Sequence, residues 1–180
     1  LFGISEVFDN IQRKADRDVF GGQIKHLLPN LQEWRDSFWP ICRGTLVGFF
    51  LGILPGGGAV VSSFASYAME KRLSKNPERF GKGAIEGVAG PESANNAATS
   101  GCFIPLFTLG IPPNAVMALL LGALMIHGLQ PGPLLIQKNP EVFWGTVMSM
   151  YIGNVLLLIL NLPLIGLWIK VLKIPYRILF

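Results

Sequence analysis

The feature that most constrains the fold of this chain is an apolar segment, residues 87–128, that is interrupted by prolines, glycines and polar side chains. The polar side chains come early, at Glu92, Asn95 and Asn96, and the segment ends in an unbroken apolar run, residues 115–126. In a soluble core such interruptions would disrupt packing. Within a membrane, non-helical backbone and polar side chains persist only where protein covers them or where they line a cavity, and there they usually mark a substrate or ion path. We therefore expect a transport site in this segment.

The composition favours an all-α integral membrane protein. Of the 180 residues, 51% are hydrophobic and only 14% are charged, so too little polar surface is available to cover a soluble globule of this size. The basic residues gather before the first apolar run, after it and near the end of the chain, which is typical of cytoplasmic loops beside membrane spans. A nucleic-acid-binding face would interleave aromatic side chains with the charge, so no nucleic acid partner is expected.

Catalytic and metal chemistry have little support in the sequence. Cys42 and Cys102 have no partner spacing, which predicts buried thiols and neither a metal site nor a disulfide. No spacing places a nucleophile beside a base, so the chain is not expected to be an enzyme. The glycines at residues 56–58 are not followed by Lys-Ser or Lys-Thr, and this excludes a nucleotide P-loop. We expect no cofactor.

The chain divides into an N-terminal connector, residues 1–38, and a membrane region, residues 39–180. The connector is amphipathic, and Asn30 is placed to cap a short helix over residues 31–38. It would lie at the membrane interface or in the cytoplasm, and a linker packed on its own protein is the alternative. The membrane region would contain a broken hairpin (39–69), a basic loop (70–83), a broken, site-forming segment (84–128) and a transmembrane span (142–169).

Residues 39–69 predict a re-entrant helical hairpin. Two apolar runs, residues 39–54 and 59–69, flank the sequence Pro-Gly-Gly-Gly, and each is too short to cross the roughly 30 Å of a hydrocarbon core. Both flanks are basic, so the chain would enter and leave on the same side of the membrane. The alternative is a single span with a kink.

The hairpin tip would suit a carboxylate. Three glycines after Pro55 let the backbone turn and approach a ligand closely, and the amides that open the second arm form the positive end of a helix. Serine hydroxyls on that arm, at Ser62, Ser63 and Ser66, could add donors.

The segment 84–128 predicts a second broken element. If Pro91 opens a helical turn, Glu92 lies on one face with Asn95 or Asn96, and an ionisable group there titrates, pairs or receives a cation. Residues 99–111 then form a short apolar arm. The two prolines that follow force an extended break, and Asn114 can cap the next helix.

Long stretches of this sequence resemble the large membrane subunit of the tripartite tricarboxylate transporters, the TctA family. They are GILPGGGA, GVAGPESANNAATSG and FIPLFTLGIPPNAVMALLLGALMIHG, and they are rich in glycine, proline, asparagine and glutamate rather than generically apolar. The resemblance covers most of the chain from residue 44 onward. One departure is Pro113, where relatives are expected to have glycine.

The resemblance implies a multi-pass permease of the bacterial inner membrane. It would work with a small membrane subunit and a periplasmic solute-binding protein that delivers carboxylates, and a cation gradient, of Na⁺ or H⁺, would drive uptake without an ATPase. It also implies a secondary transporter built as an inverted repeat, of which this chain would contain one half.

On this basis two groups of residues are assigned as candidate sites. Glu92, Asn95 and Asn96 would couple the cation, with Na⁺ at Glu92 and Asn95, since carboxylate and amide oxygens suit Na⁺. A channel or permease for another solute, or a non-transporting membrane scaffold, remains an alternative. The substrate anion would be held by Pro55, Gly56, Gly57, Gly58, Ser62, Ser63, Pro112 and Asn114.

Overall fold

The computed structural model describes residues 28–172, and every regular element in that part of the chain is a helix. The all-helical prediction is confirmed, whereas the amphipathic pattern expected within residues 1–27 lies outside the described residues. Residues 29–147 form one compact unit, and the described residues 148–172 belong to a second. In chain order the elements are α2 (Leu31–Ile53), α3 (Gly58–Leu73), η1 (Pro77–Arg79), α4 (Glu86–Leu109), α5 (Ala115–Ile126), α6 (Leu135–Lys138) and α7 (Pro140–Leu172).

Helix α2 begins at the expected cap and continues further than expected. The Asn30 side chain accepts a hydrogen bond from the Glu33 amide, and the Glu33 carboxylate accepts one from the Asn30 amide, at 2.9 and 2.7 Å. This capping box confirms the predicted cap. The short helix expected over residues 31–38 was wrong, because the helix runs on through Pro40. Proline removes one helical hydrogen bond, but Pro40 is buried, and packing of α2 against α4 offsets that loss.

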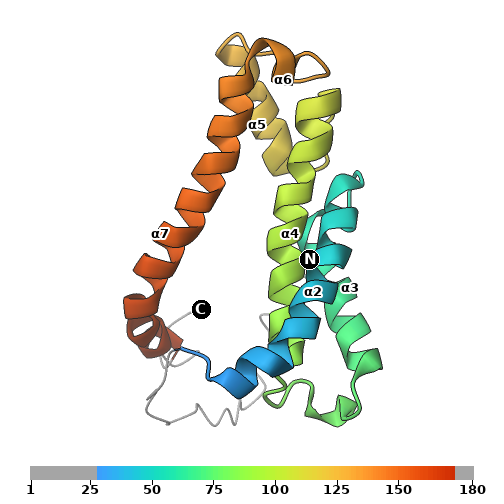
Figure 1. The fold of residues 1–180 in the computed structure, drawn as a ribbon, viewed down its shortest axis with the longest axis vertical. Coiled ribbons are helices and arrows are strands. Elements are labelled where there is room, and N and C mark those ends of the chain that lie inside the picture. Colours follow the sequence, from blue (N-terminus) through green and yellow to red (C-terminus); the bar gives the residue numbers. More distant parts are fainter. Residues whose placement is uncertain (1–27, 173–180) are drawn as a thin grey trace, which may run out of the picture. The chain divides into compact units, whose positions relative to one another are not determined.

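A helical hairpin is present where one was predicted, and its re-entrant position in a membrane stays a prediction. Helix α2 ends at Ile53, residues 54–57 turn, and α3 runs back alongside α2 with α4 beside both (Figure 1). At the other end of the hairpin, Arg43 on α2 forms an ion pair with Glu70 on α3. A kinked single span could not bring these two residues together, because they are 27 positions apart along the chain. Residues 54–57 are called the hairpin tip below.

Helices α2 and α4 run parallel at backbone contact. Along α2, Gly44, Gly48 and Gly52 are buried, and they face the backbone of Gly90, Ala94 and Ala98 in that order. A Cβ atom added at any of the three α2 glycines would overlap the carbonyl oxygen that it faces. Small residues at four-residue spacing allow such close approach, which is typical of helix pairs in membranes.

Helix α4 joins two segments that the sequence suggested were separate. It runs from Glu86 to Leu109 with Pro91 and Pro105 inside it, so neither a start at Pro91 nor a separate arm over residues 99–111 was right. Packing explains the early start: Gly87 lies against Phe80, and Gly90 lies against Ser66 and Glu70. Contacts with the hairpin and its loop therefore hold the turn that precedes Pro91.

A cluster of buried hydrophobic side chains lies around the carboxyl-terminal part of α4. Elements α4, α5 and α6 contribute its core, and Phe143 from the first turns of α7 packs against Phe107. The buried members are Cys102, Leu106, Phe107, Met117 and Leu135. Packing in this cluster holds α5 against α4, and the non-helical residues 110–114 connect the two helices.

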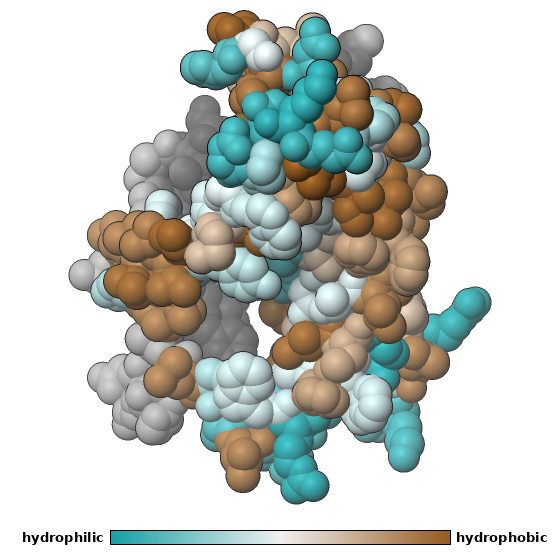
Figure 2. Space-filling view, turned by 45° about the horizontal axis from the view of Figure 1, so that its top comes forward, coloured by the Kyte–Doolittle hydropathy of each residue, from teal (hydrophilic) through white to brown (hydrophobic). Residues whose placement is uncertain are grey.

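Helix α7 has the length and composition expected of the predicted transmembrane span. Residues Pro140–Trp168, 29 in all, have a mean hydropathy of 2.0, and at 1.5 Å per residue they extend roughly 40 Å, enough to cross a bilayer. Within the described residues it is the one helix that is long and apolar enough to do so. Hydrophobic residues also cover much of the surface seen in Figure 2. The exposed large hydrophobic side chains include Phe50, Phe64, Leu119 and Leu160.

A candidate site where two helix breaks meet

The hairpin tip lies against the break between α4 and α5. The Gly56 amide donates a hydrogen bond to the Pro113 carbonyl oxygen, at 3.0 Å. Residues 110–114, called the α4–α5 break below, thus join a turn from a distant part of the sequence. Two groups of residues predicted to bind the substrate, residues 55–58 and residues 112–114, are brought together by this contact.

Glycine is required in the hairpin tip for two different reasons. Gly56 and Gly58 have φ angles of 80° and 61°, in the left-handed region that disfavours residues with a Cβ atom. Gly57 instead lacks space, because a Cβ atom there would overlap the Leu51 carbonyl oxygen. The Gly57 amide donates to the Leu54 carbonyl at 3.1 Å, which closes the turn.

The α4–α5 break is also set by local chemistry. Helix α4 ends at Leu109, and Gly110 follows it with a φ of 68° as the C-cap residue. The Gly110 and Ile111 amides donate to the carbonyls of Leu106 and Pro105 in the last turns of α4. After the two prolines, the Asn114 side chain accepts a hydrogen bond from the Met117 amide at 2.9 Å. The predicted cap at Asn114 is confirmed.

Two helices therefore begin within two residues of the Gly56–Pro113 hydrogen bond. Helix α5 has its cap, whereas no side chain among the described residues caps the first turn of α3. The first amides of a helix lack helical acceptors and lie at the positive end of its dipole. Of the two helix starts, the first turn of α3 is thus the one whose amides lack a side-chain acceptor among the described residues.

The serines of α3 point their hydroxyl groups toward the protein. Ser62 is fully buried and donates to the Gly58 carbonyl at 2.7 Å. Ser63 donates to Ala59 at 3.0 Å and lies 3.3 Å from the Pro91 carbonyl on α4. Their role as substrate donors stays a prediction, and it would require each hydroxyl to exchange its acceptor. Ser66 is buried, and its hydroxyl has no partner within the described part of the chain.

The residues predicted to couple a cation lie on α4 but away from the two breaks. Glu92 and Asn96 are exposed, Asn95 is half-buried, and the Asn96 side-chain nitrogen donates to the Glu92 carbonyl at 3.0 Å. Because Gly52 faces Ala98, Glu92 lies roughly 9 Å along the α4 axis from the level of Gly52. The structure therefore separates the hairpin tip and the α4–α5 break from a polar face of α4, which carries Glu92, Asn95 and Asn96.

That polar face includes two residues that the sequence did not suggest. Thr99 and Ser100 are exposed, and their hydroxyls donate to the carbonyls of Asn95 and Asn96, at 3.1 and 3.3 Å. Both had been placed in or beside an apolar arm. Their four-residue spacing from Asn95 and Asn96 would have revealed them if α4 had been taken as one continuous helix.

Cys102 was predicted to be a buried thiol, and it is 1% exposed, whereas Cys42 is half-buried. The Cys102 sulfur lies 3.2 Å from the Gly52 carbonyl and 3.2 Å from the Asn114 side-chain nitrogen. No pattern in the sequence pointed to this contact, because Gly52 is 50 positions away.

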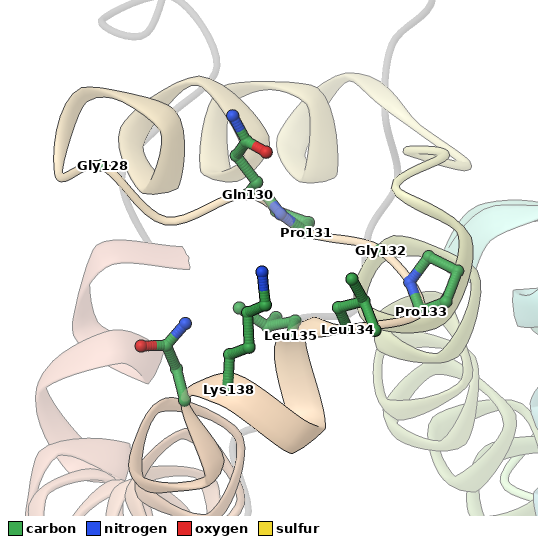
Figure 3. A pocket seen from close by; sticks show the side chains of 9 residues that line it. Gly128, Gln130, Pro131, Gly132, Pro133, Leu134, Leu135 and Lys138 are labelled. Atoms are coloured by element: carbon green, nitrogen blue, oxygen red, sulfur yellow. The ribbon is translucent and has the colours of Figure 1, made fainter.

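A separate pocket of about 310 Å³ is lined by residues of the segment 128–139, which includes α6, and contains none of the predicted site residues. Lys138 extends from α6 toward the loop that carries Gln130 and Pro131 (Figure 3). One charged side chain and the amides of Gln130 and Asn139 supply its polar groups, and no role in transport is assigned to it.

Together these features define a protein whose described residues are helical, in which two helix breaks meet and a long apolar helix follows later in the chain. A family model described as the tripartite tricarboxylate transporter TctA family matches residues 1–180, and the chain belongs to this family. It is 57% identical over 180 residues to an uncharacterized 52.8 kDa protein in the TAR-I ttuC' 3' region of Agrobacterium vitis. It is 66% identical over 133 residues, 74% of the chain, to an uncharacterized protein in the TAR-II ttuC' 3' region of the same organism.

The chain spans 36% and 55% of the lengths of these two relatives. No solved structure matches it. The family is one of transporters rather than enzymes, and a transporter acts in a membrane, so the sequence-based assignment of family and class is confirmed.

Proposed function

We propose that this chain is part of the permease subunit of a tripartite transporter that takes up di- or tricarboxylates. The observation that carries the proposal is the contact between the hairpin tip and the α4–α5 break, through Gly56 and Pro113. In membrane transporters, broken helices commonly direct their positive ends at anionic groups of the substrate. Here two helix starts lie beside one contact, and one of them is uncapped.

The substrate carboxylate would bind at the first turn of α3. The amides of Gly58 and Ala59 would donate to it, and the glycine-rich tip lets the anion approach the backbone closely. The start of α5, beyond Pro112 and Asn114, would face a second carboxylate of the same substrate through its dipole. Two separate positions for carboxylate groups would then favour a di- or tricarboxylate over a monocarboxylate.

The coupling cation would bind at the polar face of α4. The hydroxyl hydrogens of Thr99 and Ser100, and one amide hydrogen of Asn96, are directed to carbonyls of their own helix. The oxygens of these side chains are thereby left as acceptors along the same helix that carries the Glu92 carboxylate. Oxygen acceptors of this kind suit Na⁺, and Glu92 alone could carry H⁺ in its place.

The remaining parts of the system follow from the family. The partners would be a small membrane subunit and a periplasmic solute-binding protein, and the permease would cross the bacterial inner membrane several times. The rest of the longer protein would supply an inverted repeat of the broken helices and cover the exposed faces of α4 and α7. The ion gradient would drive uptake with no cofactor.

The test is uptake of labelled citrate and smaller dicarboxylates by cells that express the full-length protein with its neighbouring subunits. Uptake should require both the binding protein and a Na⁺ or H⁺ gradient. Flux that is independent of both would instead indicate a channel or a permease for another solute. If no solute accumulated while the protein was folded in the membrane, the scaffold alternative would replace the proposal.

A further inference from the structure

Cys102 connects the end of α2 to the start of α5. Its thiol donates to the Gly52 carbonyl in the last turn of α2, and its sulfur accepts from the Asn114 side-chain nitrogen, both at 3.2 Å. The residue itself belongs to α4, and its side chain is buried. One sulfur atom is therefore hydrogen-bonded to both sides of the Gly56–Pro113 contact.

Each of these hydrogen bonds meets a local need. The last carbonyls of a helix lack helical donors, and the thiol supplies a donor to Gly52. An asparagine side chain can be rotated by half a turn, which exchanges its oxygen and its nitrogen. As a cap, Asn114 must present oxygen to the Met117 amide, and the contact from its nitrogen to Cys102 selects that orientation.

We propose that Cys102 is a positioning residue that sets the hairpin tip against the α4–α5 break. Its hydrogen bonds to Gly52 and Asn114 hold the starts of α3 and α5 at the spacing that one substrate anion requires. This inference rests on the proposed function above, and Cys102 itself does not touch the substrate. A serine hydroxyl can donate and accept in the same way, whereas an alanine methyl group can do neither.

The first test measures the position of the thiol without any transport. In membranes containing the full-length protein, N-ethylmaleimide would be reacted with a variant that keeps Cys102 alone and, in parallel, with one that keeps Cys42 alone. Cys102 should react about tenfold or more slowly, because reaction requires a local opening. Asn114→Ala should accelerate its reaction about three- to tenfold, as expected for loss of one or two net hydrogen bonds.

The matched control is Asn161→Ala, since the Asn161 side chain donates to the Leu157 carbonyl of its own helix. This variant should leave the reaction rate of Cys102 unchanged. The proposal is overturned if Cys102 reacts as fast as Cys42, or if Asn114→Ala does not accelerate its reaction.

The second test measures carboxylate uptake by the full-length transporter with its partners. Cys102→Ala should raise KM about three- to tenfold while the maximal rate per folded molecule changes less than about twofold. Cys102→Ser should restore KM to within about twofold, and Cys42→Ala should change neither parameter. A wild-type KM in folded Cys102→Ala would overturn the proposal.

The two tests separate this inference from the function on which it rests. If the wild-type transporter takes up no carboxylate, the proposed function fails, and the maleimide rates still decide the role of Cys102. If Cys102→Ala does not reach the membrane, the comparison between Asn114→Ala and Asn161→Ala decides it, because both variants keep the thiol.

Discussion

Arg43 and Glu70 form a bidentate ion pair that joins α2 to α3 at the end of the hairpin away from its tip. The Arg43 nitrogens Nε and Nη2 donate to the two Glu70 carboxylate oxygens at 2.8 and 2.6 Å. Glu70 is 2% exposed and Arg43 is 36% exposed, so the carboxylate depends on this one partner while the guanidinium still reaches the surface. Substitution of Arg43 and substitution of Glu70 should therefore destabilise the hairpin by different amounts.

Arg43→Ala should destabilise the hairpin more than Glu70→Gln, because it leaves a buried carboxylate unpaired. We expect a loss of about 2–4 kcal/mol, below the range for fully buried pairs because Arg43 is partly hydrated. Arg43→Lys should recover only part of it, since lysine lacks the planar fork. Unfolding of the purified protein in detergent by increasing denaturant would measure this. Lys71→Ala, at an exposed neighbour, should have little effect, and an equal loss there would contradict the assignment.

Gly48→Ala should destabilise the contact between α2 and α4. The added methyl group would overlap the Ala94 carbonyl oxygen, and backbone cannot move aside as a flexible side chain can. Overpacking of this kind costs about 1–3 kcal/mol. The matched control is Gly122→Ala in α5, where a Cβ atom has open space, and there alanine should be neutral or stabilise by up to about 1 kcal/mol. Thermal unfolding of both variants in one detergent would compare them, and equal midpoints would disprove the close approach.

Glu92→Gln should weaken the response of uptake to the cation rather than the amount of folded protein. The charge is removed while the size and one acceptor oxygen remain, so the half-saturating Na⁺ concentration should rise about tenfold. Uptake measured across a series of Na⁺ concentrations gives this value directly. Glu78→Gln, in the exposed η1 helix, should leave it unchanged. Full Na⁺ or H⁺ dependence in Glu92→Gln would remove Glu92 from the cation site.

Thr99→Val should act in the same direction as Glu92→Gln, with a smaller rise of about two- to fivefold in half-saturating Na⁺, because one neutral oxygen ligand is lost. Thr108→Val is a close control: it lies on the same helix, and its hydroxyl also donates to the carbonyl four residues back, at 2.7 Å. Equal effects of the two variants would mean that Thr99 matters only for the helix.

The features that the sequence could predict are those set by neighbouring residues. The caps at Asn30 and Asn114 depend on a side chain and an amide three residues apart, and the hairpin tip depends on consecutive glycines. The long apolar helix α7 follows from composition alone. Each of these signals is local, so a single sequence contains it in full.

The features that it could not predict depend on contacts between distant residues. The prolines of α2 and α4 suggested breaks, but both helices continue because each packs against the other. Cys102 and Gly52 are 50 positions apart, and no spacing rule connects them. The residues predicted to bind the substrate were assigned to two separate segments, and no spacing rule revealed that the Gly56–Pro113 hydrogen bond joins them. The residues predicted to couple the cation lie apart from that contact, on the polar face of α4.

The facing stripes of glycine and alanine on α2 and α4 also bear on how the protein can move. Glycine and alanine have no side-chain rotamers, so this interface loses no side-chain conformational entropy when it forms. For the same reason it contains no flexible atoms that could fill a gap, and a separation of even half an ångström or so would forfeit much of its dispersion energy. We therefore expect the hairpin and α4 to move as a single rigid body during a transport cycle. Changes in backbone conformation would then be confined to the α4–α5 break.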